Sequence, residues 1–292
     1  MRVRVLGAAA GGGFPQWNCG CGNCRKARAG SPDVIPRTQE CVALSADGER
    51  WLLLNASPEI RSQIESFPAL HPRAPRHSPI AGIVLTNGDL DHVLGLLSLR
   101  ESQPLTVYAT EPVCRGFTED NVLYRTLERF PGQVTWKSVD GDAAGLSLLA
   151  IPTPGKLPVH LEGITSESEK QNIGLLVLDA KSGKRLAYFS AAGGVTPDMR
   201  SAIDGADCVF FDGTFWSSDE LIRLGLGTRR AEEMAHIPVE QSLAALHGTK
   251  AKKKIYIHIN NTNPMLDRTS AERRQAEEQG WAIAHDGMEF SL

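Results

Sequence analysis

The 292-residue sequence predicts a layered α/β protein with a large share of antiparallel sheet. Short apolar runs, each bounded by Gly, Pro, Asn or Asp, recur along the whole chain and are typical of strands. Helical patterns separate some of these runs, as in sheets that are covered by helices. Other runs follow one another with no helix between them, which favours antiparallel pairing over a purely doubly wound sheet.

The apolar runs and the helical patterns give a set of expected elements. The expected strands are 2–6, 42–44, 51–54, 83–85, 106–108, 134–136, 146–151, 173–178, 185–190, 208–211 and 254–259. The expected helices are 93–101, 111–129, 238–246 and 270–279, the last with hydroxyl caps and Glu272 near its start. Because no internal repeat and no low-complexity linker interrupts this order, we expect a single domain over residues 1–292.

The composition is that of a globular enzyme, with 41% hydrophobic and 22% charged residues and a net charge of −3. There is no long basic run, so nucleic acid is not an expected partner. No apolar stretch approaches the ~20 residues that span a bilayer, so no membrane span is expected. The N-terminal strand leads into a glycine-rich stretch rather than the apolar segment of a signal peptide, and we therefore expect a cytoplasmic protein.

Three of the six cysteines, Cys19, Cys21 and Cys24, lie within six residues in a glycine-rich loop. In a cytosolic chain, such a cluster indicates a metal site rather than disulfides. Thiolates are strong zinc ligands, and structural zinc takes four ligands in a tetrahedron. Residues 19–24 therefore predict a structural zinc loop whose fourth ligand is a His, Asn or Asp, or a group from another subunit. The alternative is a loop of free, redox-active thiols.

A second cluster follows the expected strand 83–85, where Asp89, Asp91 and His92 lie within four residues. A rigid strand presents the side chains of the turn that follows it together, which favours chemistry at this position. The alternative is an Asx turn that only caps the next helix, with His92 in a structural role.

This acidic turn resembles the metal-binding motif of metallo-β-lactamase-fold proteins, H-x-H-x-D-H followed by an apolar residue, any residue and Gly-Leu. Asp91, His92 and the Gly-Leu pair at 95–96 match the motif. Asn87 and Asp89 stand where the family has its first two histidines. The resemblance implies an α/β fold of the metallo-β-lactamase type, an αββα four-layer sandwich.

Other strand ends carry the same resemblance. His258 lies near the end of the expected strand 254–259 and fits the last ligand of the family. Asn55 stands where the family's earlier strand ends in Asp, and Ala191 stands in the place of the metal-bridging Asp. His160 is a candidate for the remaining histidine only by its neighbourhood.

The missing residues belong to one metal of the family's pair, whereas Asp91, His92 and His258 remain. Two-metal hydrolases of this fold attack their substrates with a hydroxide held between the metals. Two histidines and one carboxylate around open positions are typical of non-haem iron(II) oxygenases. The sequence therefore favours one Fe(II), with Asp89 or Asp212 as a further ligand or a proton-handling group.

Six longer segments resemble the pyrroloquinoline quinone (PQQ) synthesis protein B family, and they cover the chain from end to end. These segments are 11–18, 55–61, 212–216, 236–239, 258–264 and 286–292. The resemblance implies an iron-dependent hydroxylase acting on the tyrosine-derived ring of a cross-linked Glu–Tyr diamino acid in PQQ biosynthesis. Two alternatives remain: a carrier that takes PQQ or its precursor towards the periplasm, and a hydrolase with a shifted site, as in phosphodiesterases with a similar cysteine cluster.

The implied substrate is rich in carboxylates, so the pocket should offer cationic donors. Candidate donors and substrate contacts are Arg61, Arg223, Arg229, Arg230, His236, Trp17, Trp216 and Asn261. His236 is also a candidate catalytic residue, together with Asp89 and Asp212. The resemblance further implies a homodimer, with the cysteine loop as a contact, and other PQQ biosynthesis proteins as partners.

Overall fold

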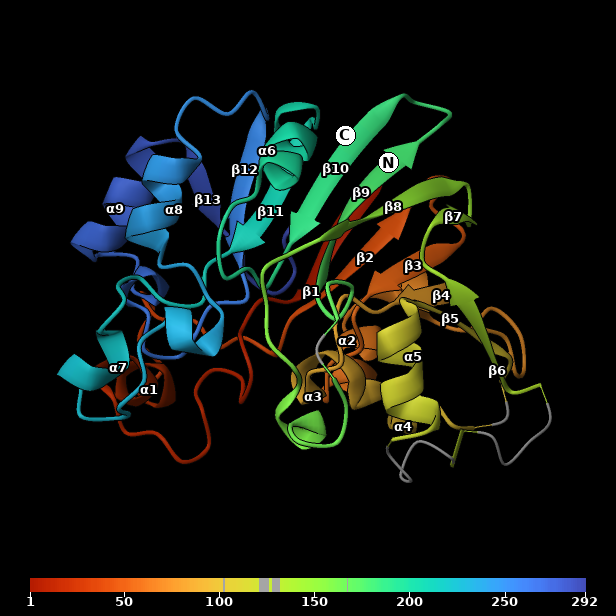
Figure 1. Cartoon of the computed structure of the whole chain (residues 1–292), viewed down its shortest axis with the longest axis horizontal. Coiled ribbons are helices and arrows are strands. Elements are labelled where there is room, and N and C mark those ends of the chain that lie inside the picture. Colours follow the sequence, from red (N-terminus) through yellow and green to blue (C-terminus); the bar gives the residue numbers. More distant parts are fainter. Residues whose placement is uncertain (102, 121–125, 128–131, 167) are drawn as a thin grey trace.

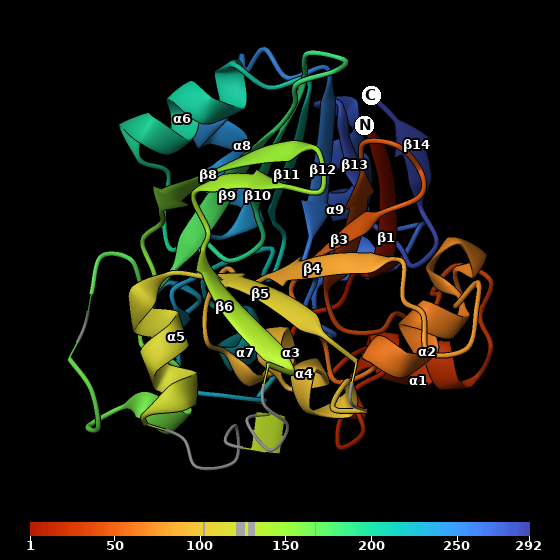
Figure 2. The same ribbon diagram turned by 90° about the vertical axis from the view of Figure 1, so that its right-hand side faces the viewer.

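The computed structural model describes residues 1–101, 103–120, 126–127, 132–166 and 168–292. Two sheets face each other, and helices cover the outer face of each (Figures 1 and 2). This is the expected αββα sandwich. None of the described helices is long and apolar enough to cross a membrane.

Each sheet has seven strands among the described residues. The first sheet has the order β14 (Glu289–Ser291), β1 (Arg2–Gly7), β2 (Cys41–Ser45), β3 (Trp51–Leu54), β4 (Ile80–Val84), β5 (Leu105–Ala109) and β6 (Val134–Ser138). The second has the order β13 (Trp281–Ile283), β12 (Lys253–Ile257), β11 (Cys208–Asp212), β10 (Lys184–Phe189), β9 (Ile173–Asp179), β8 (Leu146–Pro152) and β7 (Gly141–Ala143). β14 to β3 and β7 to β10 pair antiparallel, and the rest of each sheet is parallel.

The helices divide between the two outer faces. On the first sheet lie α2 (Ile60–Glu65), α3 (Leu90–Val93), α4 (Gly95–Ser98) and α5 (Glu111–Thr118). On the second lie α6 (Pro197–Asp204), α8 (Val239–Ala245) and α9 (Ala271–Glu278), while α1 (Gly22–Arg28) and α7 (Glu220–Arg223) lie beyond its lower edge in Figure 1. Single 3-10 turns cover Pro68–Leu70, Val159–Leu161, Glu232–Met234 and Pro264–Leu266.

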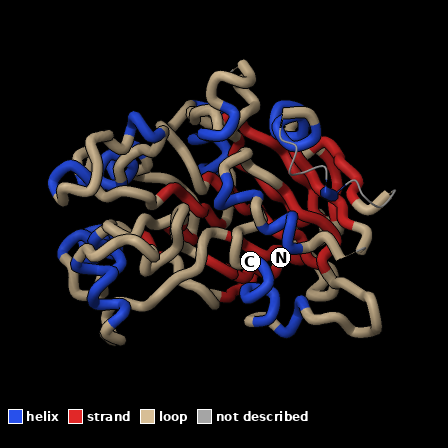
Figure 3. The backbone as a smooth tube through the Cα atoms, turned by 90° about the horizontal axis from the view of Figure 1, so that it is seen from below, coloured by secondary structure: helices blue, strands red, loops and turns tan. Residues whose placement is uncertain are grey.

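Among the described residues, three apolar cores hold the four layers together. The central core lies between the sheets and includes Leu54, Tyr188 and Phe210. One outer core packs the first sheet on its helices, and the other packs the second sheet on α6, α8 and α9. Most inner strands are buried on both faces, so the buried polar side chains are concentrated near the strand ends. Loops and helices cover this edge of the sheets, which is seen from below in Figure 3.

Two expected helices differ from the structure. The helix expected at 93–101 starts at Leu90 and divides into α3 and α4, because the Gly95 N–H donates to the Ala56 carbonyl (3.0 Å) instead of continuing the helix. Of the helix expected at 111–129, α5 ends at Thr118, and residues 121–125 and 128–129 lie outside the described residues.

Several short elements were not expected, among them α1, α2, α6, β7, β13 and β14. The two last strands have only three residues each, too few to show an alternating pattern. α1 has a cysteine rather than a hydroxyl or carboxylate at its N-cap, so the usual start signal is missing.

Candidate metal centre

Asp91, His92 and His258 form a compact group in which the candidate ligand atoms all lie within 4.8 Å of one another. Asp91 and His92 belong to α3, which follows β4, and His258 follows β12. The His258 Nε2 lies 3.1 Å and the His92 Nε2 3.8 Å from the Asp91 Oδ2. The fold thus brings together the three side chains that the sequence analysis predicts as active-site ligands.

Two residues at the strand ends near this group have a left-handed backbone conformation. His258 has a φ of 58° and Asn55, after β3, a φ of 63°. Non-glycine residues rarely adopt this region, and such strain is concentrated at functional sites. Asn55 is held by three side-chain bonds: its Oδ1 accepts from the Thr86 N–H and hydroxyl (3.0 Å each), and its Nδ2 donates to Glu40 (2.7 Å).

The His92 ring is oriented by Asn87, the residue that replaces a family histidine. The Asn87 Oδ1 accepts from the Asp89 N–H (3.0 Å) and lies 2.9 Å from the His92 Nδ1. An amide oxygen only accepts, so the Nδ1 carries the proton and the Nε2 lone pair is free. That Nε2 is buried and has no hydrogen-bond partner among the described residues. A buried acceptor without a partner is costly, and a metal ion would satisfy it.

The charges around this group are strongly coupled. Burial lowers the pKa of His92 to about 4. Burial would also raise the pKa of Asp91, but the charges of His92 and His258 hold it well below its usual range. For His258, the bond to Asp91 outweighs burial and raises the pKa to about 9. The proton between Asp91 and His258 therefore occupies the place that a bound cation would take, and metal binding would displace it.

Glu40 is a buried acid behind the three ligands, and the sequence analysis did not single it out. Its Oε2 lies 3.7 Å from the His92 Nε2, and Asn55 and the Tyr188 hydroxyl donate to its carboxyl group. Burial raises the pKa of Glu40 to about 8. A lone acidic residue before the apolar strand β2 was the only sequence signal for it.

A pocket of about 280 Å³ opens onto the metal group and is lined by Asp89, Asp91, His236 and His258. The Asp89 carboxylate has no hydrogen-bond partner among the described residues, and burial, together with the Asp91 charge, raises the pKa of Asp89 to about 6. Asp212 lies beneath the pocket, where its Oδ2 accepts from the His236 Nδ1 (2.7 Å). Asp89 and His236 thus face the pocket as expected, whereas Asp212 is fully buried behind His236.

Three expected substrate contacts lie elsewhere in the structure. Arg61 is on α2 and lines a different hollow, with Glu59 and Ser98. Trp216 is 8% exposed and belongs to the core beside the second sheet, because an apolar ring gains more from burial there. Asn261 points at the cysteine cluster. These three positions correct the expectation that they line the substrate pocket.

Of the other candidate residues, some line the pocket and some lie elsewhere. Arg229 lines the pocket, and so does Lys156, which the sequence analysis missed because it lies in no motif. Arg223 is tied to Asp219 (3.1 Å) and to the Ser217 hydroxyl (2.6 Å). Trp17 is 85% exposed. His160 belongs to neither of the histidine-containing metal groups among the described residues.

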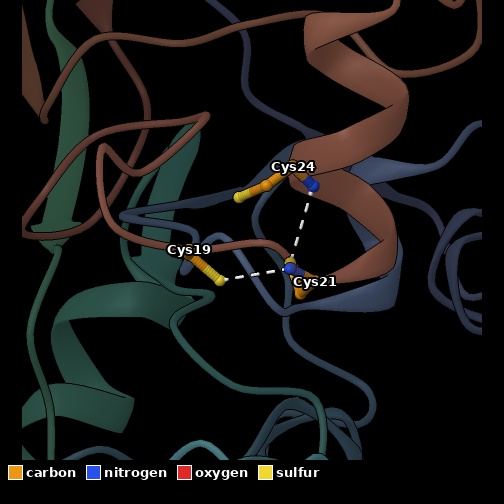
Figure 4. A group of neighbouring side chains, drawn as sticks. All are labelled: Cys19, Cys21 and Cys24. Atoms are coloured by element: carbon orange, nitrogen blue, oxygen red, sulfur yellow. Dashed lines mark hydrogen bonds between the residues drawn. The ribbon is translucent and has the colours of Figure 1, made fainter.

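The sulfurs of Cys19, Cys21 and Cys24 form a second group within 4.8 Å of one another (Figure 4). The Cys21 N–H points at the Cys19 sulfur (3.4 Å) and the Cys24 N–H at the Cys21 sulfur (3.5 Å). Only the first part of the segment is a loop, because Cys21 caps α1 and Cys24 lies within it. Burial raises the pKa of Cys24 to about 11, while hydrogen bonds outweigh burial and lower the pKa of Cys21.

The side-chain amide of Asn261 lies against all three sulfurs, 3.1, 3.7 and 3.5 Å from Cys19, Cys21 and Cys24. The two ends of an amide are assigned by their hydrogen bonds, so its oxygen can face the sulfurs equally well. Three thiolates and an amide oxygen around one point suit a tetrahedral zinc ion. The sequence left a His, an Asn or Asp, or a group from another subunit open as the fourth ligand. The fold places one of these, Asn261, at the cluster.

Comparisons with known proteins agree with this fold. Residues 50–259 match the family model of the beta-lactamase superfamily domain. The chain is 44% identical to the coenzyme PQQ synthesis protein B of Methylorubrum extorquens and 42% identical to that of Bradyrhizobium diazoefficiens, over 100% of both chains in each case. A crystal structure of Zn(2+)-bound PqqB from Methylobacterium extorquens is 44% identical, with a TM-score of 0.93 and full coverage of both chains. A diphosphatase from the PhnP family shares the fold at 21% identity and a TM-score of 0.70, over 100% of this chain and 97% of the other.

The fold is that of the beta-lactamase superfamily, and the side chains grouped at its strand ends can hold a metal ion. Within that superfamily, the chain belongs to the coenzyme PQQ synthesis protein B family and takes part in PQQ biosynthesis.

Proposed function

We propose that the chain is an iron(II)-dependent oxygenase that hydroxylates the tyrosine-derived ring of the cross-linked Glu–Tyr diamino acid. The observation that carries the proposal is the group of Asp91, His92 and His258, in which the buried His92 Nε2 has no partner among the described residues. Two imidazoles and one carboxylate suit Fe(II) and leave positions open for other ligands. Bound iron would supply the activation of dioxygen.

The residues around the metal group orient its ligands and handle protons. Asn87 holds the His92 Nδ1–H, so the Nε2 lone pair is fixed toward the metal position. Asp89 and His236 line the pocket and can take up the proton that the ring loses when it is hydroxylated. Burial raises the pKa of Asp89 to about 6, which suits it to exchange a proton near neutral pH.

Lys156 and Arg229 line this pocket, and we propose that they bind the substrate's carboxylates. No acidic side chain among the described residues forms an ion pair with either of them, so their charges are available to a ligand. A charge-assisted hydrogen bond contributes about 1.5–3 kcal/mol.

A Lys156→Ala variant should therefore raise KM for the diamino acid about tenfold and leave kcat within about twofold, because the lost bond acts equally on bound substrate and transition state. Steady-state kinetics at saturating oxygen would measure both. Lys181→Ala, an exposed lysine outside the pocket, is the matched control. An unchanged KM would remove Lys156 from the substrate site.

The proposed function is tested by protein reconstituted anaerobically with iron(II), then given the diamino acid, oxygen and a reductant such as ascorbate. Insertion of one oxygen atom into a ring C–H bond reduces the other atom to water, and the reductant supplies the two electrons that this requires. We expect His92→Ala and His258→Ala to lose pocket iron and hydroxylated product to background, because each removes one of three ligands. His247→Ala, an exposed histidine away from the pocket, should retain both. Full activity in both ligand variants would show that the proposed centre is wrong.

The same assay separates the competing functions. Tight binding of PQQ without oxygen consumption would favour a carrier. Cleavage of a generic phosphodiester, with no oxygen consumed, would favour a hydrolase. Either outcome contradicts the oxygenase proposal.

A further inference from the structure

The hydroxyl of Thr214 lies at the centre of a second group of candidate ligands, Asp212, His236 and His258. Its Oγ1 is 2.6 Å from the Asp212 Oδ1, 2.8 Å from the His258 Nδ1 and 3.1 Å from the His236 Nδ1. Thr214 lies two residues after the end of β11 and is 3% exposed. The point at which three ligands would hold a metal ion is therefore filled by an oxygen atom of the protein.

The protons of this network can be assigned from donor and acceptor chemistry. The Asp212 carboxylate only accepts, and it already receives the Thr214 N–H (2.9 Å) and the Ala192 N–H (2.8 Å). The Thr214 hydroxyl has one proton. The His258 carbonyl, 3.0 Å away, could accept that proton, but the shorter contact to the charged carboxylate is the stronger bond.

With its one proton donated to Asp212, the Thr214 oxygen can only accept from His258. The His258 Nδ1 must then carry a proton, and its Nε2, on the Asp91 side, is left to bind a metal. The His236 Nδ1 lies 2.7 Å from the Asp212 Oδ2 and must also carry a proton. Both histidines line the pocket, and one buried pair, Asp212 and Thr214, determines which nitrogen of each ring can act there.

We propose that Thr214 is a positioning residue that fixes the Nδ1 proton of His258, so that only the Nε2 of this ring can bind a metal, and that the Thr214 hydroxyl prevents the Asp212 group from binding a second metal ion. The proposal rests on the proposed metal group of Asp91, His92 and His258. It does not depend on which reaction that group performs. Partners of this kind hold a metal-binding imidazole in one tautomer and raise its affinity for the ion.

The test compares Thr214→Val, which keeps the shape and removes the hydroxyl, with Thr214→Ser, which keeps the hydroxyl. Cobalt(II) is the probe, added to full-length protein whose cysteine cluster has first been saturated with zinc(II). We expect the Val variant to bind pocket cobalt about 10- to 100-fold more weakly and the Ser variant to bind it as the unchanged protein does. Equal affinity in the Val variant, with its thermal unfolding unchanged, would overturn the proposal.

A second measurement reads the tautomers without relying on activity. In protein loaded with diamagnetic zinc(II), the Nδ1–H protons of His258 and His236 should give slowly exchanging NMR signals, and the His258 signal should be lost in Thr214→Val and kept in Thr214→Ser. Binding of two cobalt ions in the unchanged pocket, or an Nε2–H signal from His258, would overturn the proposal. The His92→Ala variant separates failure of the metal-group proposal from failure of the Thr214 proposal. If this variant binds cobalt as the unchanged protein does, the proposed metal group is wrong, whatever the result for Thr214.

Discussion

A Gly95→Ala variant is expected to lose about 3 kcal/mol or more of folding stability, because the added methyl group meets backbone that cannot move aside. A Cβ at position 95 would lie 2.3 Å from the Ser57 carbonyl oxygen and 2.8 Å from the Ala56 carbonyl oxygen. These contacts are far inside van der Waals distance.

The same contact supports the metal group. The Gly95 N–H donates to the Ala56 carbonyl (3.0 Å), and the Ala56 N–H donates to the His92 carbonyl (2.7 Å). Pushing α4 away from residues 56–57 would therefore move α3, which carries Asp91 and His92. We expect pocket metal to be lost together with stability.

Thermal unfolding and metal content of Gly95→Ala would be measured beside Gly194→Ala. A Cβ at position 194 meets no heavy atom within 4 Å, so that control should change stability by less than about 1 kcal/mol. A Gly95→Ala protein with the melting temperature and metal content of the unchanged protein would contradict the packing argument.

The second large effect is expected at the cysteine cluster, where Cys24→Ser should remove a zinc ion. We propose that Cys19, Cys21 and Cys24 hold this zinc with Asn261 as the fourth ligand. Structural zinc contributes about 10–16 kcal/mol of binding free energy in small zinc-dependent folds. This chain has large apolar cores of its own, so we expect a smaller loss, about 3 kcal/mol, and a melting temperature lower by on the order of 10 °C.

Loss of this zinc should also weaken metal binding in the pocket. Asn261 lies three residues after His258, and the Asn23 side chain donates to the carbonyls of Asn261 (3.2 Å) and Asn263 (3.0 Å). The cluster thus holds the segment that begins at His258, the candidate metal ligand with a left-handed backbone conformation. Elemental analysis and thermal unfolding would check both effects.

Cys114→Ser is the matched control for Cys24→Ser, because Cys114 is a half-buried cysteine of α5 outside the cluster. It should keep the zinc. A Cys24→Ser protein with one full equivalent of zinc at this position would exclude the structural role of the cluster.

The sequence by itself determined the fold class, the family and the three active-site candidates that follow strand ends. Strand ends are local features: Asp91 in the turn after the apolar run 83–85, and His258 near the end of the expected strand 254–259, can be identified from neighbouring residues. The αββα sandwich was implied by the resemblance of these motifs to the metallo-β-lactamase family. The tight spacing of Cys19, Cys21 and Cys24 is equally local. These features can be predicted because each depends on residues a few positions apart.

Only the tertiary structure decided how the rest of the site is built, because those contacts join residues far apart in the chain. From the sequence, Asn87 is only the replacement of a metal-binding histidine. In the fold, its side-chain oxygen is the hydrogen-bond acceptor that orients His92. Asn261 reads as a substrate contact and lies instead against the cysteines.

Thr214, Glu40 and Lys156 are residues to which sequence alone assigns no role. Thr214 acts through a hydroxyl whose single proton can be assigned only when Asp212, His236 and His258 are seen around it. Hydrogen bonds and burial depend on distance in space, and spacing along the chain carries no information about them until the two sheets have closed on each other.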